Sequence, residues 1–179
     1  MADSSPRNND GPRKSAAFGA PRDSAMKANA WPPGQTLLSL VATGVLGGLK
    51  IGGMSIFPTR RQDVTLLGAL GLVTSIGISM AGAQQFRQHK NPIPHGYKVQ
   101  TIVQKGIYQF TRNPMYVGMV GAVGSLGLIV NSFWGFLFQA YLYTVLSYKV
   151  IPFEEEYLQV NFGKEYLDYK AKVPRWLLF

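Results

Sequence analysis

The longest apolar block of the chain predicts a hairpin of two membrane-spanning helices. Residues 113–148 carry no formal charge over 36 positions, which is more than one helix needs to cross a bilayer. A polar pair, Asn131-Ser132, lies inside this block and marks a turn. We therefore predict one helix over residues 114–130 and a second over residues 133–153.

Two earlier apolar segments predict two further spans. Residues 64–83 form an uncharged run of twenty positions, and residues 36–57 form another that is interrupted by Lys50. The expected fold is therefore an all-α integral membrane protein with about four transmembrane helices. Glycines recur at helical spacing in two of these segments, which favours close helix packing and equally leaves room for a ligand against the backbone. They are Gly44, Gly48 and Gly52, and Gly118, Gly121, Gly124 and Gly127.

Basic residues are distributed unevenly among the expected loops, and this distribution predicts the orientation. The chain has 18 Lys and Arg against 9 Asp and Glu, a formal net charge of +9. Most of these bases lie in the N-terminal tail, between the second and third spans, and in the C-terminal tail; the opposite side has only Arg60 and Arg61. Because cytosolic loops collect Lys and Arg, we expect both termini in the cytosol. The same placement explains the net charge without a nucleic-acid partner.

The first 33 residues differ in composition from the rest of the chain. They are rich in Ser, Pro, Asn, Gly and Arg and lack hydrophobic periodicity, so residues 1–33 are expected to be a disordered basic tail. Residues 34–179 are expected to form the membrane domain. We expect no secretory signal peptide, because the tail has no apolar stretch. With no cysteine and two histidines, we expect neither a disulfide framework nor a metal centre.

A short run before the third span carries the first candidate chemistry. Asn113 followed by Pro114 is typical of a helix start, because Asn caps a helix and Pro suits its first turn. The free N–H groups and the positive end of the helix dipole would then lie beside Arg112 at the cytosolic mouth. The pattern predicts an anion site, and it is also typical of a capped membrane helix with a topology-setting arginine.

Three consecutive carboxylates at the end of the fourth span are the second candidate. Glu154, Glu155 and Glu156 would oppose the dipole of a helix that ends there. They could hold a cation, orient a ribose hydroxyl or pair with Arg112; alternatively, a new cytosolic helix starts at Glu154. Beyond them, Gly163 interrupts the helical pattern, and the rest is expected to be a cytosolic amphipathic segment on the membrane surface.

Two motifs in these regions together resemble those of a known superfamily. The first runs from Val103 to Gly118 as Val-x-x-Gly-Ile-Tyr-x-x-x-Arg-Asn-Pro-x-Tyr-x-Gly. The second runs from Glu154 to Tyr169 as Glu-Glu-x-x-Leu-x-x-x-Phe-Gly-x-x-Tyr-x-x-Tyr. They resemble the signatures of the isoprenylcysteine carboxyl methyltransferases and their phospholipid methyltransferase relatives. The pair is more specific than either motif alone, and the resemblance covers roughly residues 94–176.

The resemblance implies an integral membrane methyltransferase that uses S-adenosylmethionine, most like the isoprenylcysteine carboxyl O-methyltransferases. The cofactor would bind at the cytosolic mouth, the lipophilic substrate would enter from the bilayer, and an endomembrane such as the endoplasmic reticulum is the expected location. The catalytic residues implied by position are Arg112, Tyr116 and Glu155. The implied cofactor-binding residues are Gln100, Gly106, Tyr108, Asn113, Pro114, Glu154 and Tyr166, with Tyr169 as a further candidate.

The same resemblance suggests roles for some of these residues. Arg112 would neutralise an anionic group of the substrate or cofactor, and Asn113 with the following N–H groups would hold the cofactor carboxylate. Glu154 or Glu155 would contact cofactor hydroxyls or orient Arg112. Tyr116 would line the methyl-transfer site.

Two departures from the prenylcysteine pattern leave the methyl acceptor open. Asn113 stands where those enzymes have a histidine, and Gln100 stands near another histidine of their pattern. Asn-Pro-Met-Tyr is more like the phospholipid methyltransferases, so N-methylation of phosphatidylethanolamine is the alternative. The residues from Phe162 to Tyr169 are more like the prenylcysteine enzymes. Further alternatives are an NADPH-dependent sterol-type membrane reductase and a non-catalytic membrane scaffold.

Overall fold

The fold is described here from a computed structural model, which covers residues 31–59, 61–89, 91 and 99–177. Within these residues the chain is helical and has no strand, only an isolated bridge between Ser55 and Ser132. This confirms the all-α class. The expected disordered tail lies outside the described residues, apart from its last positions, where the first described helix already begins at Pro32.

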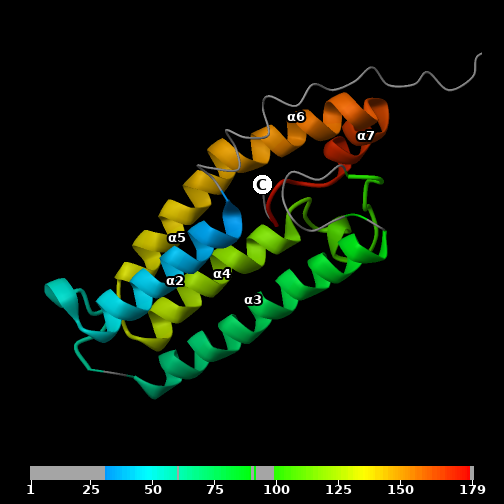
Figure 1. Cartoon of the computed structure of the whole chain (residues 1–179). Coiled ribbons are helices and arrows are strands. Elements are labelled where there is room, and N and C mark those ends of the chain that lie inside the picture. Colours follow the sequence, from blue (N-terminus) through cyan, green and yellow to red (C-terminus); the bar gives the residue numbers. More distant parts are fainter. Residues whose placement is uncertain (1–30, 60, 90, 92–98, 178–179) are drawn as a thin grey trace, which may run out of the picture.

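Four apolar helices form the body of the molecule (Figure 1). They are α2 (Pro32–Gly48), α3 (Gln62–Gln88), α4 (Pro114–Ile129) and α5 (Trp134–Val145). Helix α4 packs against α2, α3 and α5, so it is the central helix. Helix α5 continues through a π-helical turn, Leu146–Val150, into α6 (Ile151–Phe162), and α7 (Lys164–Lys172) folds back after it. The C-terminal segment after α7 returns between α6 and the start of α4.

Two helix ends differ from the expected ones by more than five residues. The first expected helix, residues 36–57, ends at Gly48, because Lys50 (φ 52°) and Gly52 (φ 75°) turn the backbone into left-handed conformations. The fourth expected helix, residues 133–153, does not end before the glutamates. It remains helical to Phe162 and stops at Gly163, whose φ of 52° terminates the helix as the sequence predicts.

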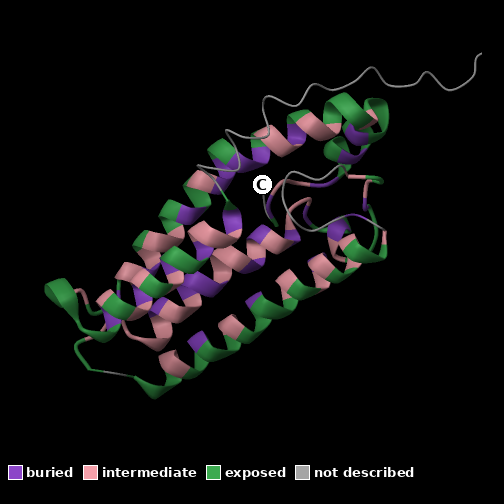
Figure 2. Cartoon of the chain, viewed as in Figure 1, coloured by how far each residue is buried: buried purple, intermediate pink, exposed green. Residues whose placement is uncertain are grey.

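One described helix, α3, has the length and composition of a membrane span. Its 27 residues give a length of about 40 Å, enough to cross the hydrocarbon core with some tilt. The side of α3 away from α4 carries apolar side chains that are 60–70% exposed: Leu66, Leu67, Leu70, Val73 and Met80. Figure 2 shows this face of α3 as mostly exposed. Such an apolar surface is typical of a helix that faces lipid.

Small residues bring α3 and α4 close together. A Cβ at Gly118 of α4 would meet the backbone oxygen of Ser75 and the hydroxyl of Ser79 on α3. A Cβ at Gly82 of α3 would likewise press against Pro114 at the start of α4. The glycines of α4 therefore serve helix packing, whereas Gly44 of α2 has open space around its Cβ position.

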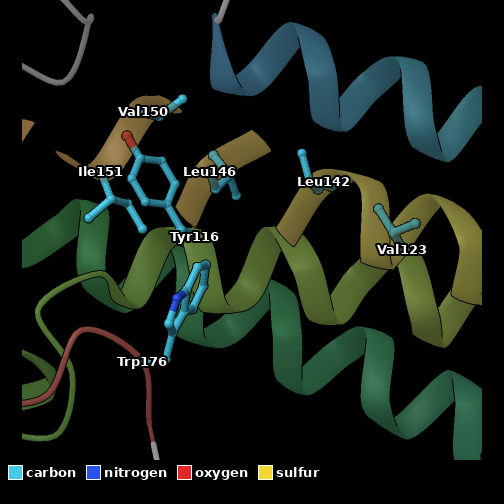
Figure 3. Close-up of a cluster of buried hydrophobic side chains, with 7 residues drawn as sticks. All are labelled: Tyr116, Val123, Leu142, Leu146, Val150, Ile151 and Trp176. Atoms are coloured by element: carbon cyan, nitrogen blue, oxygen red, sulfur yellow. The ribbon is translucent and has the colours of Figure 1, made fainter. Parts of the chain in front are cut away.

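The main apolar core joins α4, the α5–α6 rod and the C-terminal segment (Figure 3). Its buried members are Tyr116, Val123, Leu142, Leu146, Val150, Ile151 and Trp176. Trp176 is the only member from the C-terminal segment, and it anchors that segment on the helices. A smaller cluster of Tyr166, Tyr169 and Val173 packs α7 beneath the same region. Two clusters therefore fix the polar groups described next.

Candidate active site

Glu155 of α6 is the centre of a buried ionic cluster. Glu155 is 6% exposed. Its carboxylate lies 2.9 Å from Nη1 of Arg112, 2.8 Å from Nη2 of Arg175 and 3.3 Å from Nζ of Lys170. We call these four residues the Glu155 cluster. They come from α6, from the loop before α4, from α7 and from the C-terminal segment. The Glu155 carboxylate on α6 thus contacts cations from three other parts of the fold. The cluster contains three positive charges and one negative charge.

Arg112 is fixed in place by three neighbours. Its Nη1 donates to the Tyr166 hydroxyl at 2.9 Å as well as contacting Glu155, and its backbone N–H donates to the Pro174 carbonyl at 3.0 Å. The side chain is 9% exposed. Its Nε is buried without a hydrogen-bond partner among the described residues. An unsatisfied buried donor of this kind is costly and marks a place where a bound group can supply the missing acceptor.

The loop before α4 holds the C-terminal segment by its backbone. The Arg175 carbonyl accepts a hydrogen bond from Thr111 Oγ1 at 2.9 Å and another from Asn113 Nδ2 at 3.1 Å. The Asn113 amide is therefore engaged with the protein chain. The implied role of Asn113 in holding a cofactor carboxylate gains no support from this geometry, which favours a role in placing Arg175.

The π-helical turn in the α5–α6 rod faces the same segment. Ser147 in this turn accepts a hydrogen bond from the Trp176 indole N–H at its Oγ (3.2 Å) and one from Arg175 Nη1 at its carbonyl (3.4 Å). A π turn inserts an extra residue into a helix and frees backbone carbonyls, and such turns are frequent at functional sites. Here the inserted turn presents Ser147 to Arg175 and Trp176.

Two tyrosines of the first motif lie next to the Glu155 cluster. Tyr116 is 4% exposed, and its hydroxyl donates to Glu154 Oε1 at 2.7 Å. Tyr108 is also buried; its carbonyl accepts a hydrogen bond from the Tyr169 hydroxyl at 2.8 Å. Two direct contacts therefore join the first motif to the second: Tyr116 to Glu154, and Tyr108 to Tyr169.

The surroundings of Glu155 keep it ionised. Burial alone would raise the pKa of Glu155, but the hydrogen bond from Arg175 and the charges of Arg112, Arg175 and Lys170 outweigh burial and hold the pKa below its usual value. In return, the hydrogen bond with Glu155 raises the pKa of Arg175. Burial is the main cause that raises the pKa of the Tyr166 hydroxyl, and the negative charge of Glu155 is the second. The hydroxyl therefore stays protonated at neutral pH.

A cavity of about 390 Å³ opens beside the cluster, and we call it the cationic cavity. It is lined by Arg112, Tyr143, Ser147, Tyr148, Lys170, Val173, Pro174, Arg175 and Trp176. These residues include three cations, three aromatic rings and no carboxylate. The rings of Tyr143 and Trp176 lie 4.9 Å apart on one wall. The chemistry of this lining suits an anionic group attached to an apolar or aromatic body.

A second cavity, of about 370 Å³, borders Glu155 directly. Its lining comes from α6 and α7: Pro152, Glu155, Glu156, Gln159, Val160 and Lys170. Lys170 therefore borders both cavities, whereas Glu155 and Glu156 line the second cavity and not the cationic one.

The structure brings some of the expected site residues together and leaves others apart. Arg112, Glu155 and Tyr166 are in direct contact, and Tyr116 and Glu154 are paired nearby. Pro114 is buried and begins α4. Neither Gln100 nor Gly106 takes part in the Glu155 cluster. Gln100 is exposed and donates its backbone N–H to Asn91 Oδ1 at 2.7 Å; Gly106, with φ 60°, packs against the Gln85 amide.

Three residues of the site were not among the expected ones. Arg175, Lys170 and Ser147 line the cationic cavity, and the first two contact Glu155. Arg175 lies just before Trp176 in an otherwise apolar C-terminal stretch, and this was the available signal. The sequence interpretation counted Arg175 and Lys170 only as cytosolic charges. Ser147 gave no signal, because a π turn has the composition of an ordinary apolar helix.

Comparison with known families identifies the class of this protein. The phospholipid methyltransferase family matches residues 64–165, which is more than half of the chain. The chain therefore belongs to the phospholipid methyltransferase family, and the resemblance found in the two motifs is confirmed. The matched region contains α3, α4, α5 and α6, with Arg112, Tyr116 and the glutamates, but ends before Lys170 and Arg175.

Among individual relatives, the matches are protein-S-isoprenylcysteine O-methyltransferases. The Mus musculus enzyme is 32% identical over 133 residues, which cover 70% of this chain and 46% of the mouse protein. The Schizosaccharomyces pombe enzyme is 37% identical over 78 residues, or 43% of this chain and 33% of the yeast protein. The chain spans less than half the length of these curated relatives. No solved structure matches it.

Proposed function

We propose that this protein is a membrane-embedded, S-adenosylmethionine-dependent methyltransferase that methylates the carboxylate of a lipophilic acceptor, most like a prenylated cysteine. The observation that carries the proposal is the cationic cavity, which combines three cations with three aromatic rings beside the paired motifs of the family. The names of the similar proteins, all protein-S-isoprenylcysteine O-methyltransferases, support the same reaction.

The residues of the cationic cavity fit the carboxylate and the adenine of S-adenosylmethionine. Arg112 and Lys170 can pair with its carboxylate, and the buried, unsatisfied Nε of Arg112 indicates a missing acceptor. The ring of Tyr148 offers a face on which an adenine can stack. The cavity volume, about 390 Å³, lies in the range of small-molecule sites. When bound, this group supplies an electrophilic methyl on a sulfonium.

The role of the protein side chains is then mainly to position and to exclude water. A carboxylate acceptor needs no general base, because it is already an anion at neutral pH. Glu155 orients Arg112 through the 2.9 Å contact, and Tyr116 with Glu154 closes the wall next to it. Holding donor and acceptor in line within a water-poor cavity accounts for the rate enhancement.

The arrangement of charge favours a carboxylate over an amine acceptor. Methylation of a neutral amine moves the positive charge from the donor sulfonium to the acceptor nitrogen, which would then lie beside Arg112, Lys170 and Arg175. Glu155 is surrounded by cations, and Glu154 accepts the Tyr116 hydroxyl. The name of the matching family supports phospholipid N-methylation as the second candidate, and the experiment below separates the two.

We also propose how the chain lies in the membrane. Helices α2, α3, α4 and α5 would cross the bilayer, and the loop before α4, α6, α7 and both termini would lie on the cytosolic side. The apolar outer face of α3 and the basic residues near the cluster support this arrangement. Residues 34–179 would form the membrane domain, in the endoplasmic reticulum or another endomembrane. The acceptor would enter from the lipid.

Methyl transfer from radiolabelled S-adenosylmethionine to two acceptors tests the proposal. Purified full-length protein in detergent is offered a farnesylcysteine analogue and phosphatidylethanolamine in parallel. Base-labile label on the farnesylcysteine analogue is the expected result, because a methyl ester hydrolyses in base. Stable label on phosphatidylethanolamine would instead establish N-methylation. Folded protein that binds NADPH and not S-adenosylmethionine would favour a reductase, and protein that binds neither would favour a scaffold.

A further inference from the structure

Positive charge exceeds negative charge in the cationic cavity even after Glu155 is counted. Arg112, Lys170 and Arg175 line the cavity, and Glu155 can neutralise only one of them. The methyl donor proposed above carries one carboxylate against an ammonium and a sulfonium, so it adds positive charge overall. The excess of positive charge therefore favours an anionic acceptor in the cavity with or without the bound donor.

Arg175 is the cation best placed to meet that anionic acceptor. Arg112 is 9% exposed, and its Nη1 is already shared by Glu155 and the Tyr166 hydroxyl. The Arg175 side chain is 33% exposed on the cavity wall, and its Nη1 makes only a long contact of 3.4 Å with the Ser147 carbonyl. Its planar group can present two parallel N–H donors to a carboxylate, which a lysine cannot do.

The surroundings of Arg175 hold it ready for such a ligand. Thr111 and Asn113 fix its backbone carbonyl, and Glu155 fixes one edge of its guanidinium. The neighbouring residue, Trp176, forms an aromatic wall with Tyr143 directly beside it. A rigid cation next to an apolar wall matches a ligand whose carboxylate ends an apolar body.

We propose that Arg175 is a specificity-determining residue that binds the carboxylate of the methyl acceptor, while Trp176 and Tyr143 contact the adjoining apolar part. This inference rests on the proposed function for the chemical class of the acceptor. The C-terminal segment then selects an anionic acceptor and rejects an amine, whose nitrogen would take over the positive charge of the sulfonium next to Arg175.

A binding experiment without the methyl donor tests this inference. Calorimetric titration of the full-length protein in detergent compares a farnesylcysteine analogue that has a free carboxylate with its methyl ester. We expect wild type to bind the carboxylate about tenfold more tightly, the contribution of one charge-assisted contact. Arg175→Gln should reduce this preference to about twofold or less, and Arg175→Lys should give an intermediate preference. Lys164→Gln, on the exposed side of α7 and paired with Asp168, is the matched control that keeps the wild-type preference.

Each outcome decides the question. Equal affinity of wild type for carboxylate and ester, or no binding of either, overturns the inference, as does an unchanged preference in Arg175→Gln. Thermal unfolding establishes that Arg175→Gln is folded; if it is not, Arg175→Lys decides, and an unchanged preference there overturns the inference. Wild type that prefers the carboxylate but transfers no methyl group refutes the proposed function and leaves this inference standing.

Discussion

Arg112 and Glu155 form a buried ion pair, 2.9 Å between Nη1 and Oε1, that joins the two sequence motifs of the family. The side chains are 9% and 8% exposed, so the pair lies away from bulk solvent. Charges buried in this way are tolerated when each has several polar partners. Glu155 meets this condition with Arg175 and Lys170, whereas Arg112 keeps an unsatisfied Nε. Arg112 lines the cationic cavity, so a ligand bound there can accept the hydrogen bond that its Nε lacks.

Replacing Glu155 by glutamine should lower both stability and activity. Glu155→Gln leaves three cations without their shared carboxylate, and losing one partner of a buried pair typically costs about 3 kcal/mol or more. Urea titration in detergent measures the free energy of unfolding, and label transfer to the farnesylcysteine analogue measures activity. Glu165→Gln, at an exposed position at the start of α7, should change neither. A Glu155→Gln protein with wild-type stability and turnover would contradict the central place given to this carboxylate.

The same carboxylate predicts a dependence of stability on pH. Because the folded protein holds the pKa of Glu155 below its ordinary value of 4.5, ionised Glu155 contributes stability above that pH. This contribution is lost as pH falls from about 4.5 through the lower pKa of the folded state. Thermal unfolding between pH 3 and 7 should therefore show a steeper acid loss for wild type than for Glu155→Gln. Parallel curves for the two proteins would be inconsistent with a depressed pKa.

The sequence predicts the helical hairpin and the start of α4 well, and for identifiable reasons. Pro114 begins α4 as predicted, although the Asn113 side chain makes no capping hydrogen bond and donates to the Arg175 carbonyl instead. The turn at Asn131 interrupts an otherwise apolar block. The Arg112–Glu155 pair was one of several alternatives suggested by the motifs, and the fold brings these two residues together. The hairpin and the start of α4 depend on residues that are close in sequence, and the Arg112–Glu155 pair was suggested by the two motifs.

The remaining features depend on long-range packing that local patterns do not encode. Arg175 meets Glu155 only because Trp176 packs against the α5–α6 rod and because Thr111 holds the Arg175 carbonyl. Gln100, which stands near a histidine of the prenylcysteine pattern, donates its backbone N–H to Asn91 and is not part of the Glu155 cluster. The π turn at Ser147 has no compositional mark. An apolar helical pattern predicts the helix and not the inserted residue.

The hydrogen bond from Tyr116 to Glu154 should matter for turnover more than for cofactor affinity. Tyr116→Phe removes a buried hydroxyl that donates to a carboxylate at 2.7 Å, and such a charged hydrogen bond is worth about 1.5 kcal/mol. We expect the unfolding free energy to fall by about that amount and kcat by about tenfold. Binding of S-adenosylmethionine, measured by calorimetry, should change little. Tyr141→Phe removes an exposed hydroxyl bonded to Gln35 and is the control; an equal loss in both variants would argue against a site role for Tyr116.

The contact between α3 and α4 predicts that Gly118 of α4 cannot be replaced by a larger residue without loss of stability. A methyl group at Gly118 would collide with the Ser75 backbone oxygen, which cannot move without displacing α3, so overpacking should cost about 2 kcal/mol. Gly118→Ala should therefore lower the free energy of unfolding. Because Gly118 lies on α4 two residues after Tyr116, the substitution should also lower activity. Gly44→Ala makes the same substitution on α2 where the Cβ meets open space, and it should cause no loss, since alanine favours a helix over glycine. Similar losses at Gly44 and Gly118 would show that helix flexibility, and not the close approach of α3, governs the response.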